Sequence, residues 1–395
     1  MTKKIILFLI IVLITQNSKS QNLNILDAKF SPLSNTIALT VGDDKNSNLM
    51  LYFVDKNELS RKLIPDSLKE TTVREFEFSP EGGKIALLLT TGMITDLYVY
   101  IIKTKSLIRC TNSDDLKVNN DLAYKDALNW CDDQSVIFLS KHSGLSQQYI
   151  FDFSNLTFKA NGISNGNEYS LIYSRKSQES YYTASINNKE PSVYKRKLGS
   201  SVNVEISKDG NNHMTPFLSD QNNYLFYYVM PYIYPGIYDL NTLKSVKTKL
   251  PKSNVRIIGW TEKDTSFVYT FSHYETEENF PIIDIFSYNY FTQKKQLISN
   301  KIEPNLGLLC SPDCSKIIYY KASDTESTNK NTRKYKPESI QTFMSNNKGL
   351  NRDFPFYGVA RDWSVDNKTV VFTFDNKLTL LDVETGNKKS ILIEN

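Results

Sequence analysis

The three histidines of this 395-residue chain are its best candidates for metal or acid–base chemistry. His142 and His273 each follow an apolar run that is typical of a strand, and His213 lies in a polar connection before another such run. Metal ligands must be brought together by short spacing or by the fold. The spacing of these histidines requires neither, so we predict loop histidines and no metal site.

The four cysteines form two pairs that a disulfide could join. Cys310 and Cys314 flank one predicted tight turn, where Cys314 takes a position that favours glycine. Cys110 and Cys131 each end a predicted strand. An exported protein meets oxidising conditions, and the span of such a turn suits disulfide geometry. Each pair is a candidate disulfide, with free buried thiols as the alternative.

The motifs of several enzyme classes are missing. The segment GLSQQ (144–148) lacks the second glycine of a nucleophile elbow, and no P-loop, G-x-G-x-x-G or H-E-x-x-H motif occurs. Glu275, Glu277 and Glu278 follow His273 as candidate acids, but a charge run is usually a solvated surface. We therefore predict no catalytic residue and no cofactor.

The densest group of aromatic residues is YYVMPYIYPGIY (227–238). Tyr232 and Tyr234 lie there between two prolines, in a predicted loop, and Tyr274 directly follows His273. Rigid exposed tyrosines offer a large contact area at a small entropic cost. They favour a recognition surface, with packing onto neighbouring strands as the alternative.

A recurring hairpin positions these residues. In EFEFSPEGGKIALLL (75–89), an alternating strand reaches a Ser-Pro-Glu-Gly turn and returns as an apolar strand. Proline presets the first turn position, and glycine accepts the left-handed one. Looser copies follow at intervals of 42 to 53 residues, a period typical of propellers. The residues before the turns are Phe30, Phe78, Trp130, Tyr173, Leu218, Trp260, Cys310 and Trp363.

Each hairpin is followed by a second pair of strands, so that four strands fill one period. The second strand of a unit is apolar throughout, as in TVVFTF (369–374), which indicates burial on both faces. The fourth strand is polar, as an outer edge should be. We predict an all-β chain in which residues 21–395 form one β-propeller of eight four-stranded antiparallel blades, with six or seven blades as alternatives.

Three details of this propeller can be predicted. The fourth unit is the weakest, because its turn lacks both proline and glycine. The polar segment 323–333 is expected to be a loop without regular structure. Loops between second and third strands open on the same face as the links between blades. We therefore expect Tyr232, Tyr234, Tyr274 and the three histidines to share one face.

The repeat resembles a known family. The pattern F/W-S-P-D-G-x-x-I-A, followed by L-Y-x-x-D-x-x-T-G, is similar to the TolB-type, WD40-like propeller repeat of exported bacterial proteins. Residues 78–89 with 97–112, and 363–374 with 378–391, match it best. TolB itself has six blades behind an N-terminal domain, for which this chain has no room. Eight units instead resemble the propeller of the dipeptidyl peptidase family, here without its hydrolase domain.

Residues 1–20 have the features of a cleaved signal peptide. Lys3 and Lys4 precede an apolar stretch over 5–14, and small residues precede Gln21. The apolar stretch is shorter than the roughly 18–20 residues of a transmembrane helix. We predict a mature protein that begins at Gln21, has no stable membrane insertion and is periplasmic or extracellular.

The charge of the mature chain is nearly balanced. Loss of Lys3, Lys4 and Lys19 with the signal peptide lowers the net charge from +4 to about +1. Such a balance, without a basic cluster, argues against nucleic acid as a partner.

These features predict an exported propeller that binds or scaffolds an envelope or secreted protein, with a small molecule or glycan as a further candidate ligand. The alternative is a propeller enzyme, a lyase or hydrolase that acts on a polysaccharide or peptide at the mouth of the channel. Pectate-type lyases of similar architecture hold a metal by histidines on one propeller face. That alternative requires histidines, carboxylates or a metal to converge there.

Overall fold

The computed structural model describes residues 24–393, with short internal gaps. The gaps are 44, 69, 93, 112–127, 142–143, 163–164, 188, 208–210, 262–263, 275–280, 303–306, 323–324, 330–331, 336–338, 347–348, 350 and 355. The predicted signal peptide lies outside the described residues. Within them, every regular element is a strand or a short turn, and no helix that could cross a membrane occurs.

The described strands form eight four-stranded antiparallel sheets, which we call blades 1 to 8, and one separate two-stranded hairpin. The four strands of a blade follow one another along the chain, except in blade 7, where this hairpin is inserted between the second and third strands. Blades 1 and 2 contain β1 (Asn24–Phe30), β2 (Thr36–Gly42), β3 (Ser47–Phe53), β4 (Glu58–Leu59), β5 (Thr71–Phe78), β6 (Lys84–Thr91), β7 (Ile94–Ile101) and β8 (Ser106–Arg109). Blades 3 and 4 contain β9 (Leu128–Trp130), β10 (Ser135–Ser140), β11 (Gln147–Asp152), β12 (Thr157–Ala160), β13 (Gly166–Ser174), β14 (Glu179–Ile186), β15 (Ser192–Lys197) and β16 (Val204–Glu205).

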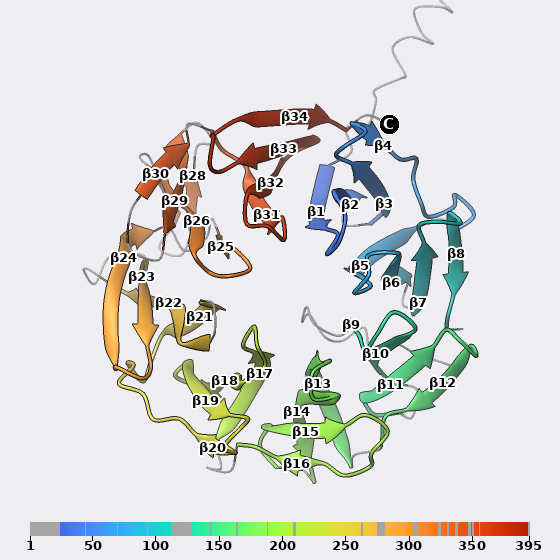
Figure 1. The fold of residues 1–395 in the computed structure, drawn as a ribbon, viewed down its shortest axis with the longest axis horizontal. Coiled ribbons are helices and arrows are strands. Elements are labelled where there is room, and N and C mark those ends of the chain that lie inside the picture. Colours follow the sequence, from blue (N-terminus) through green and yellow to red (C-terminus); the bar gives the residue numbers. More distant parts are fainter. Residues whose placement is uncertain are drawn as a thin grey trace, which may run out of the picture.

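Blades 5 and 6 contain β17 (Asn212–Leu218), β18 (Tyr224–Met230), β19 (Tyr234–Asp239), β20 (Lys244–Ser245), β21 (Val255–Trp260), β22 (Ser266–His273), β23 (Ile282–Asn289) and β24 (Lys294–Ile302). Blades 7 and 8 contain β25 (Leu308–Cys310), β26 (Lys316–Ala322), β29 (Ile340–Asn346), β30 (Asn351–Phe354), β31 (Val359–Trp363), β32 (Thr369–Phe374), β33 (Lys377–Asp382) and β34 (Lys388–Leu392). The blades form a closed ring, with the first strand of each at the centre and the fourth at the rim (Figure 1). The predicted eight-bladed propeller is confirmed.

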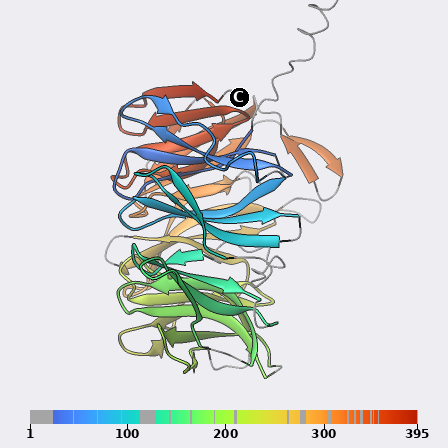
Figure 2. The same ribbon diagram turned by 90° about the vertical axis from the view of Figure 1, so that its right-hand side faces the viewer.

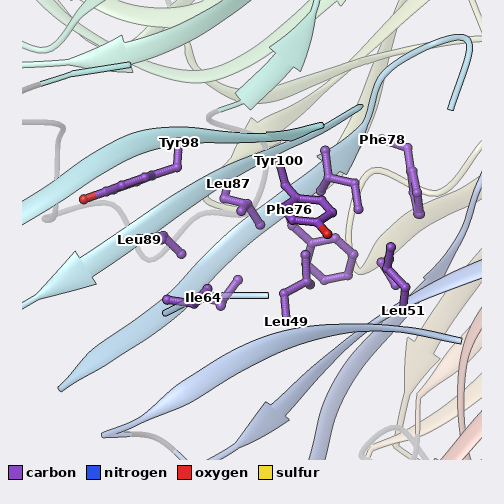
Figure 3. Close-up of a cluster of buried hydrophobic side chains, with 12 residues drawn as sticks. Leu49, Leu51, Ile64, Phe76, Phe78, Leu87, Leu89, Tyr98 and Tyr100 are labelled. Atoms are coloured by element: carbon purple, nitrogen blue, oxygen red, sulfur yellow. The ribbon is translucent and has the colours of Figure 1, made fainter. Parts of the chain in front are cut away.

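Apolar side chains between neighbouring blades hold the ring together. The second strands are buried over almost their whole length, as in β6, where Ile85, Leu87 and Leu89 are buried. These three pack against Leu49 and Leu51 of blade 1 (Figure 3). Burial of large aliphatic side chains is worth about 1.5–3 kcal/mol each. The continuous apolar runs of the sequence therefore stabilise contacts on both faces of each sheet.

The recurring turn has a common hydrogen-bonding pattern. In blade 2, the amide of Gly82 donates to the Ser79 carbonyl at 2.8 Å, and the Ser79 hydroxyl accepts from the amide of Lys84 at 3.2 Å. Gly82 has φ of 67°, and Cys314 takes the corresponding place in blade 7 with φ of 49°. The left-handed conformation predicted for Cys314 is therefore present.

Lysines join the turns of neighbouring blades. The Lys84 ammonium donates to the Asp133 carbonyl in the turn of blade 3, at 2.6 Å. Lys316 of blade 7 makes the same bond to the Asn367 carbonyl of blade 8, at 2.7 Å. Hydrogen bonds from a charged donor are among the stronger ones in proteins. These lysines thus tie blade 2 to blade 3 and blade 7 to blade 8.

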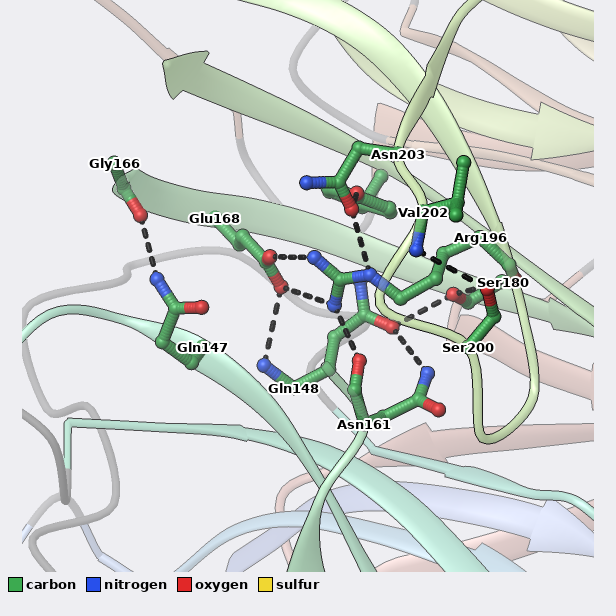
Figure 4. A network of polar contacts seen from close by, with 11 residues as sticks. Gln147, Gln148, Asn161, Gly166, Glu168, Ser180, Arg196, Ser200, Val202 and Asn203 are labelled. Atoms are coloured by element: carbon green, nitrogen blue, oxygen red, sulfur yellow. Dashed lines mark hydrogen bonds and ion pairs between the residues drawn. The ribbon is translucent and has the colours of Figure 1, made fainter. Parts of the chain in front are cut away.

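Blades 3 and 4 are joined by a buried polar network (Figure 4). Arg196 in β15 and Glu168 in β13 form an ion pair with 2.5 Å between Nη2 and Oε1, and both side chains are fully buried. Arg196 also donates to the Asn161 carbonyl at 2.6 Å, and Glu168 accepts from the amide of Gln148 at 3.1 Å. Because Gln148 and Asn161 belong to blade 3, the pair ties the weakest predicted repeat to its neighbour.

The ring closes between blades 1 and 8 without strand exchange. In the described part of the chain, each of these blades is made from one contiguous segment. The Ile25 amide donates to the Asp375 carbonyl at 2.8 Å, and the Phe30 amide donates to Asp362 Oδ2 at 2.7 Å. Apolar residues of both blades complete the closure.

Two features differ from, or go beyond, the sequence-based expectation. The segment expected to be an irregular loop contains the hairpin of β27 (Thr325–Asn329) and β28 (Thr332–Tyr335), which projects from one face of the ring (Figure 2). That prediction was wrong because two polar segments can pair as strands without showing any apolar pattern in the sequence.

Six of the eight innermost strands also contain a register shift, as between Val73 and Glu75. Such bulges bend a strand.

Candidate functional site

The two faces of the ring differ in how they are built. One, the turn face, carries the turns that join first to second and third to fourth strands. The other, the loop face, carries the second-to-third loops and the links between blades. On the turn face, polar groups of the turns form hydrogen bonds within a turn or with the turn of a neighbouring blade. The loop face is therefore the better candidate for a binding surface.

Tyr232 lies on the loop face, in the short connection between β18 and β19. Its side chain is 66% exposed. Its backbone is fixed, because the Tyr232 carbonyl accepts from the amide of Asn254 at 2.9 Å and the next carbonyl accepts from the amide of Val255 at 3.0 Å. Both donors belong to blade 6, so blade 6 holds a loop of blade 5.

Tyr274 and His273 lie at the same end of blade 6. Tyr274 is 65% exposed and directly follows the last residue of β22. His273 Nε2 lies 3.0 Å from Oδ2 of Asp284 in β23, and its ring stacks on Phe271. The residue before it, Ser272, donates its amide to the Asn254 carbonyl at 3.0 Å.

Asn254 therefore connects the two groups. Its amide binds the loop of Tyr232, and its carbonyl binds the strand end of His273 and Tyr274. We call Tyr232, Tyr274, His273 and Asp284 the tyrosine patch. Exposed aromatic side chains on a fixed backbone present contact area without the cost of ordering a loop.

The other predicted patch residues lie elsewhere. Tyr234 is the first residue of β19, pairs with Val229 and packs half-buried against the core of blades 4 and 5. His213 lies in β17 rather than in the preceding link, is fully buried and makes an edge contact with the Tyr227 ring at 5.1 Å. His142 lies outside the described residues, as do Glu275, Glu277 and Glu278. The structure thus brings together three of the six predicted residues.

A small cavity lies beside the patch, where the innermost strands of blades 6 and 7 meet. Its volume is about 190 Å³. Its walls are mainly aliphatic: Ile257, Ile258, Ile283, Ile302 and Leu308. Arg256, which is exposed, Gly307 and the hydroxyl-bearing Tyr228 and Thr270 complete the lining.

The cavity and the patch share their supporting residues. Arg256 directly follows Val255, whose amide binds the Tyr232 loop. The Thr270 hydroxyl donates to the Arg256 carbonyl at 3.3 Å, and the Tyr228 hydroxyl donates to the Ile257 carbonyl at 3.4 Å. Burial raises the pKa of Tyr228, so this phenol stays neutral at ordinary pH. Sequence reasoning missed the cavity, although Arg256 interrupts an otherwise apolar strand.

No protein-family model and no curated protein matches the chain. Solved structures do. An oligogalacturonate lyase from Vibrio parahaemolyticus has TM-score 0.56 and 11% identity, over 87% of this chain and 95% of that one. The WD40 domain of SCAP from fission yeast has TM-score 0.56 and 13% identity, over 92% and 93%. An oligogalacturonate lyase in complex with manganese has TM-score 0.53 and 12% identity, over 92% and 98%.

The fold is that of a WD40-like β-propeller. The fold expected from the TolB-type, WD40-like repeat is therefore confirmed. At these identities the similarity concerns the fold alone, and the function of a propeller depends on its own site residues.

A metal centre in this propeller would need several ligands close together. Among the described residues, no three His, Cys, Asp or Glu side chains lie close enough to hold a metal ion. His273 has one carboxylate partner, Asp284, and His213 is enclosed in the core.

The four cysteines of the propeller are free thiols in the structure. The sulfurs of Cys310 and Cys314 lie 2.7 Å apart. Cys110 packs between blades 2 and 3, whereas Cys131 packs between blades 3 and 4. Burial raises the pKa of both to about 12. Both proposed disulfides remain predictions.

Proposed function

We propose that this propeller is exported and binds a protein partner through the tyrosine patch, with no catalysis of its own. The blade cores and the tied turn face stabilise the ring, which leaves loop-face residues available for binding. Tyr232 and Tyr274 are each about two-thirds exposed there. Interfaces are enriched in tyrosine because its ring buries much area and its hydroxyl can form a hydrogen bond.

The observation that carries this proposal is the double use of Asn254. One residue binds the backbone at Tyr232 and at Ser272, two residues before Tyr274, by hydrogen bonds of 2.9 and 3.0 Å. Two aromatic side chains on an already ordered backbone avoid the cost of ordering a loop on binding. The paired His273 and Asp284 add hydrogen-bonding groups at the edge of the same surface.

The test is capture of a partner from an envelope fraction and from the culture medium by immobilised protein. We expect a protein that wild type retains and that Tyr232→Ala/Tyr274→Ala retains at least about tenfold less. Phe291→Ala is the matched control, because Phe291 is 67% exposed on the turn face of blade 6. Equal retention by wild type and the double variant would remove the patch as the binding surface.

Export is tested separately. The first residue of the protein in the periplasm or medium should be Gln21, as the features of residues 1–20 predict. An intact Met1 in protein from the membrane fraction would contradict export by a cleaved signal peptide.

A further inference from the structure

We propose that the cavity beside Arg256 binds the C-terminal residue of a polypeptide, with an aliphatic side chain in the cavity and the terminal carboxylate on Arg256. This inference rests on the proposed function, because it states which part of a protein partner the propeller holds.

The cavity selects an apolar group of limited size. Five aliphatic side chains form its walls. Its volume of about 190 Å³ is comparable to an engineered apolar cavity of about 150 Å³ that binds benzene. A leucine, isoleucine or valine side chain fits such a space. A sugar would find few hydrogen-bond donors there, because the hydroxyls of Tyr228 and Thr270 already donate to backbone carbonyls.

Arg256 sets a second requirement on the group that binds in the cavity. Its side chain is exposed, and no described carboxylate forms an ion pair with it. Its backbone is held by the hydrogen bond from Thr270 and by the β21–β22 pairing. A guanidinium binds a carboxylate by two parallel hydrogen bonds. The occupant should therefore carry a carboxylate next to its apolar group.

The C-terminal residue of a polypeptide supplies both groups on one Cα atom. The preceding residues of the same chain would then leave the cavity towards Tyr232, since residues 254–256 connect the two sites. A free aliphatic acid has the same two groups without a preceding chain. The experiment must distinguish these two sources.

Binding is measured by isothermal titration calorimetry with short probes in which only small residues precede the last one, so that no large side chain reaches the tyrosine patch. The probes are Gly-Ser-Gly-Leu with a free carboxylate, its C-terminal amide, Gly-Ser-Gly-Gly with a free carboxylate, and 4-methylpentanoate. We expect the leucine acid to bind, and the amide and the glycine peptide to bind about 10- to 100-fold more weakly. Arg256→Gln should weaken binding of the leucine acid to the level of its amide.

Arg74→Gln is the matched control. Arg74 is an exposed arginine on the innermost strand of blade 2, with its Nε 3.4 Å from the Thr90 hydroxyl. This variant should bind the leucine acid like wild type. Ile258→Trp, which fills the cavity, should abolish binding while Arg256 remains. Both cavity variants are compared only if their melting temperatures match wild type.

Three results would overturn the inference. These are equal binding of acid and amide, no effect of Arg256→Gln, and tighter binding of 4-methylpentanoate than of the peptide. The last result would assign the cavity to a free aliphatic acid. A failure of the proposed function is distinguishable, because it appears as unchanged partner capture by the tyrosine double variant while these probes still bind at Arg256.

Discussion

The carboxylate of Asp362 in blade 8 accepts a hydrogen bond from the backbone amide of Phe30 in blade 1, with 2.7 Å between Oδ2 and the nitrogen. Its other oxygen accepts from the amide of Trp363 at 2.9 Å. This carboxylate lies at the closure of the ring. Burial raises the pKa of Asp362 to about 6, and the two amide donors oppose that shift.

The raised pKa predicts how closure depends on pH. Since the folded pKa exceeds the unfolded value of 3.8, the stabilisation is complete below about pH 4 and is lost as pH rises through about 6. The full loss is on the order of 2–3 kcal/mol. We expect Asp362→Asn to lower the free energy of unfolding, relative to wild type, by more at about pH 5 than at neutral pH. Denaturant unfolding at the two pH values measures this.

Asp366→Asn is the control for this experiment. The Ser364 hydroxyl donates to Asp366, which lowers the pKa of that carboxyl. Asp366 is thus ionised at both pH values, and its substitution should have the same effect at each. A pH-independent effect of Asp362→Asn would contradict the prediction.

The buried pair of Arg196 and Glu168 predicts strong non-additivity. Arg196→Met alone leaves the Glu168 carboxylate buried without its cation and should cost about 3–5 kcal/mol of unfolding free energy. Adding Glu168→Leu should recover most of that loss. Lys29→Met is the control: Lys29 pairs with Glu77, and the two side chains are 31% and 38% exposed, so this substitution should cost about 1 kcal/mol or less. Additive losses in the double variant would show that the two charges are not coupled.

The tyrosines near the patch should differ in their effect on stability. Tyr234→Ala removes a half-buried ring from the core of blades 4 and 5 and should cost about 2 kcal/mol. Tyr232→Ala and Tyr274→Ala remove exposed rings and should change stability by less than about 0.5 kcal/mol. Thermal unfolding of the three single variants provides the comparison. An equal loss for Tyr232→Ala would identify it as a packing residue.

Oxidation should distinguish the two cysteine pairs. The sulfurs of Cys310 and Cys314 are in contact, whereas Cys110 and Cys131 lie in different apolar clusters. With a mild oxidant, we expect a disulfide between Cys310 and Cys314 first. Alkylation under denaturing conditions followed by peptide mass analysis would show Cys110 and Cys131 labelled and the other two protected. Labelling of all four would argue against this disulfide.

The sequence predicts the propeller well because each blade is encoded locally. The turn of Ser79 and Gly82, the apolar second strands and the period fix four strands within one segment. The bulges of the innermost strands are not predictable in this way, because they depend on how the ring curves. Polar residues can also pair as strands, which is why β27 and β28 were missed.

The candidate site is less predictable because it combines residues from several blades. Tyr232 and Tyr274 could be placed on the correct face from their loops alone. Tyr234 and His213 could not, since their burial depends on side chains of β14, β15 and β18. The cavity at Arg256 is lined by residues of blades 5, 6 and 7. Its one sign in the sequence is a charged residue within an otherwise apolar strand.

Among the described strands, blades 1 and 8 exchange no strand at the closure, so the ring does not require any particular blade to come first in the chain. Ile25 and Ile393 both donate their amides to the β32–β33 turn, to the carbonyls of Asp375 and Asn376 at 2.8 Å. The two ends of the described chain are therefore neighbours. A circular permutant that joins them by a short linker and opens at another link between blades should assemble the same eight sheets. In such a gene, any of the eight blades could be translated first.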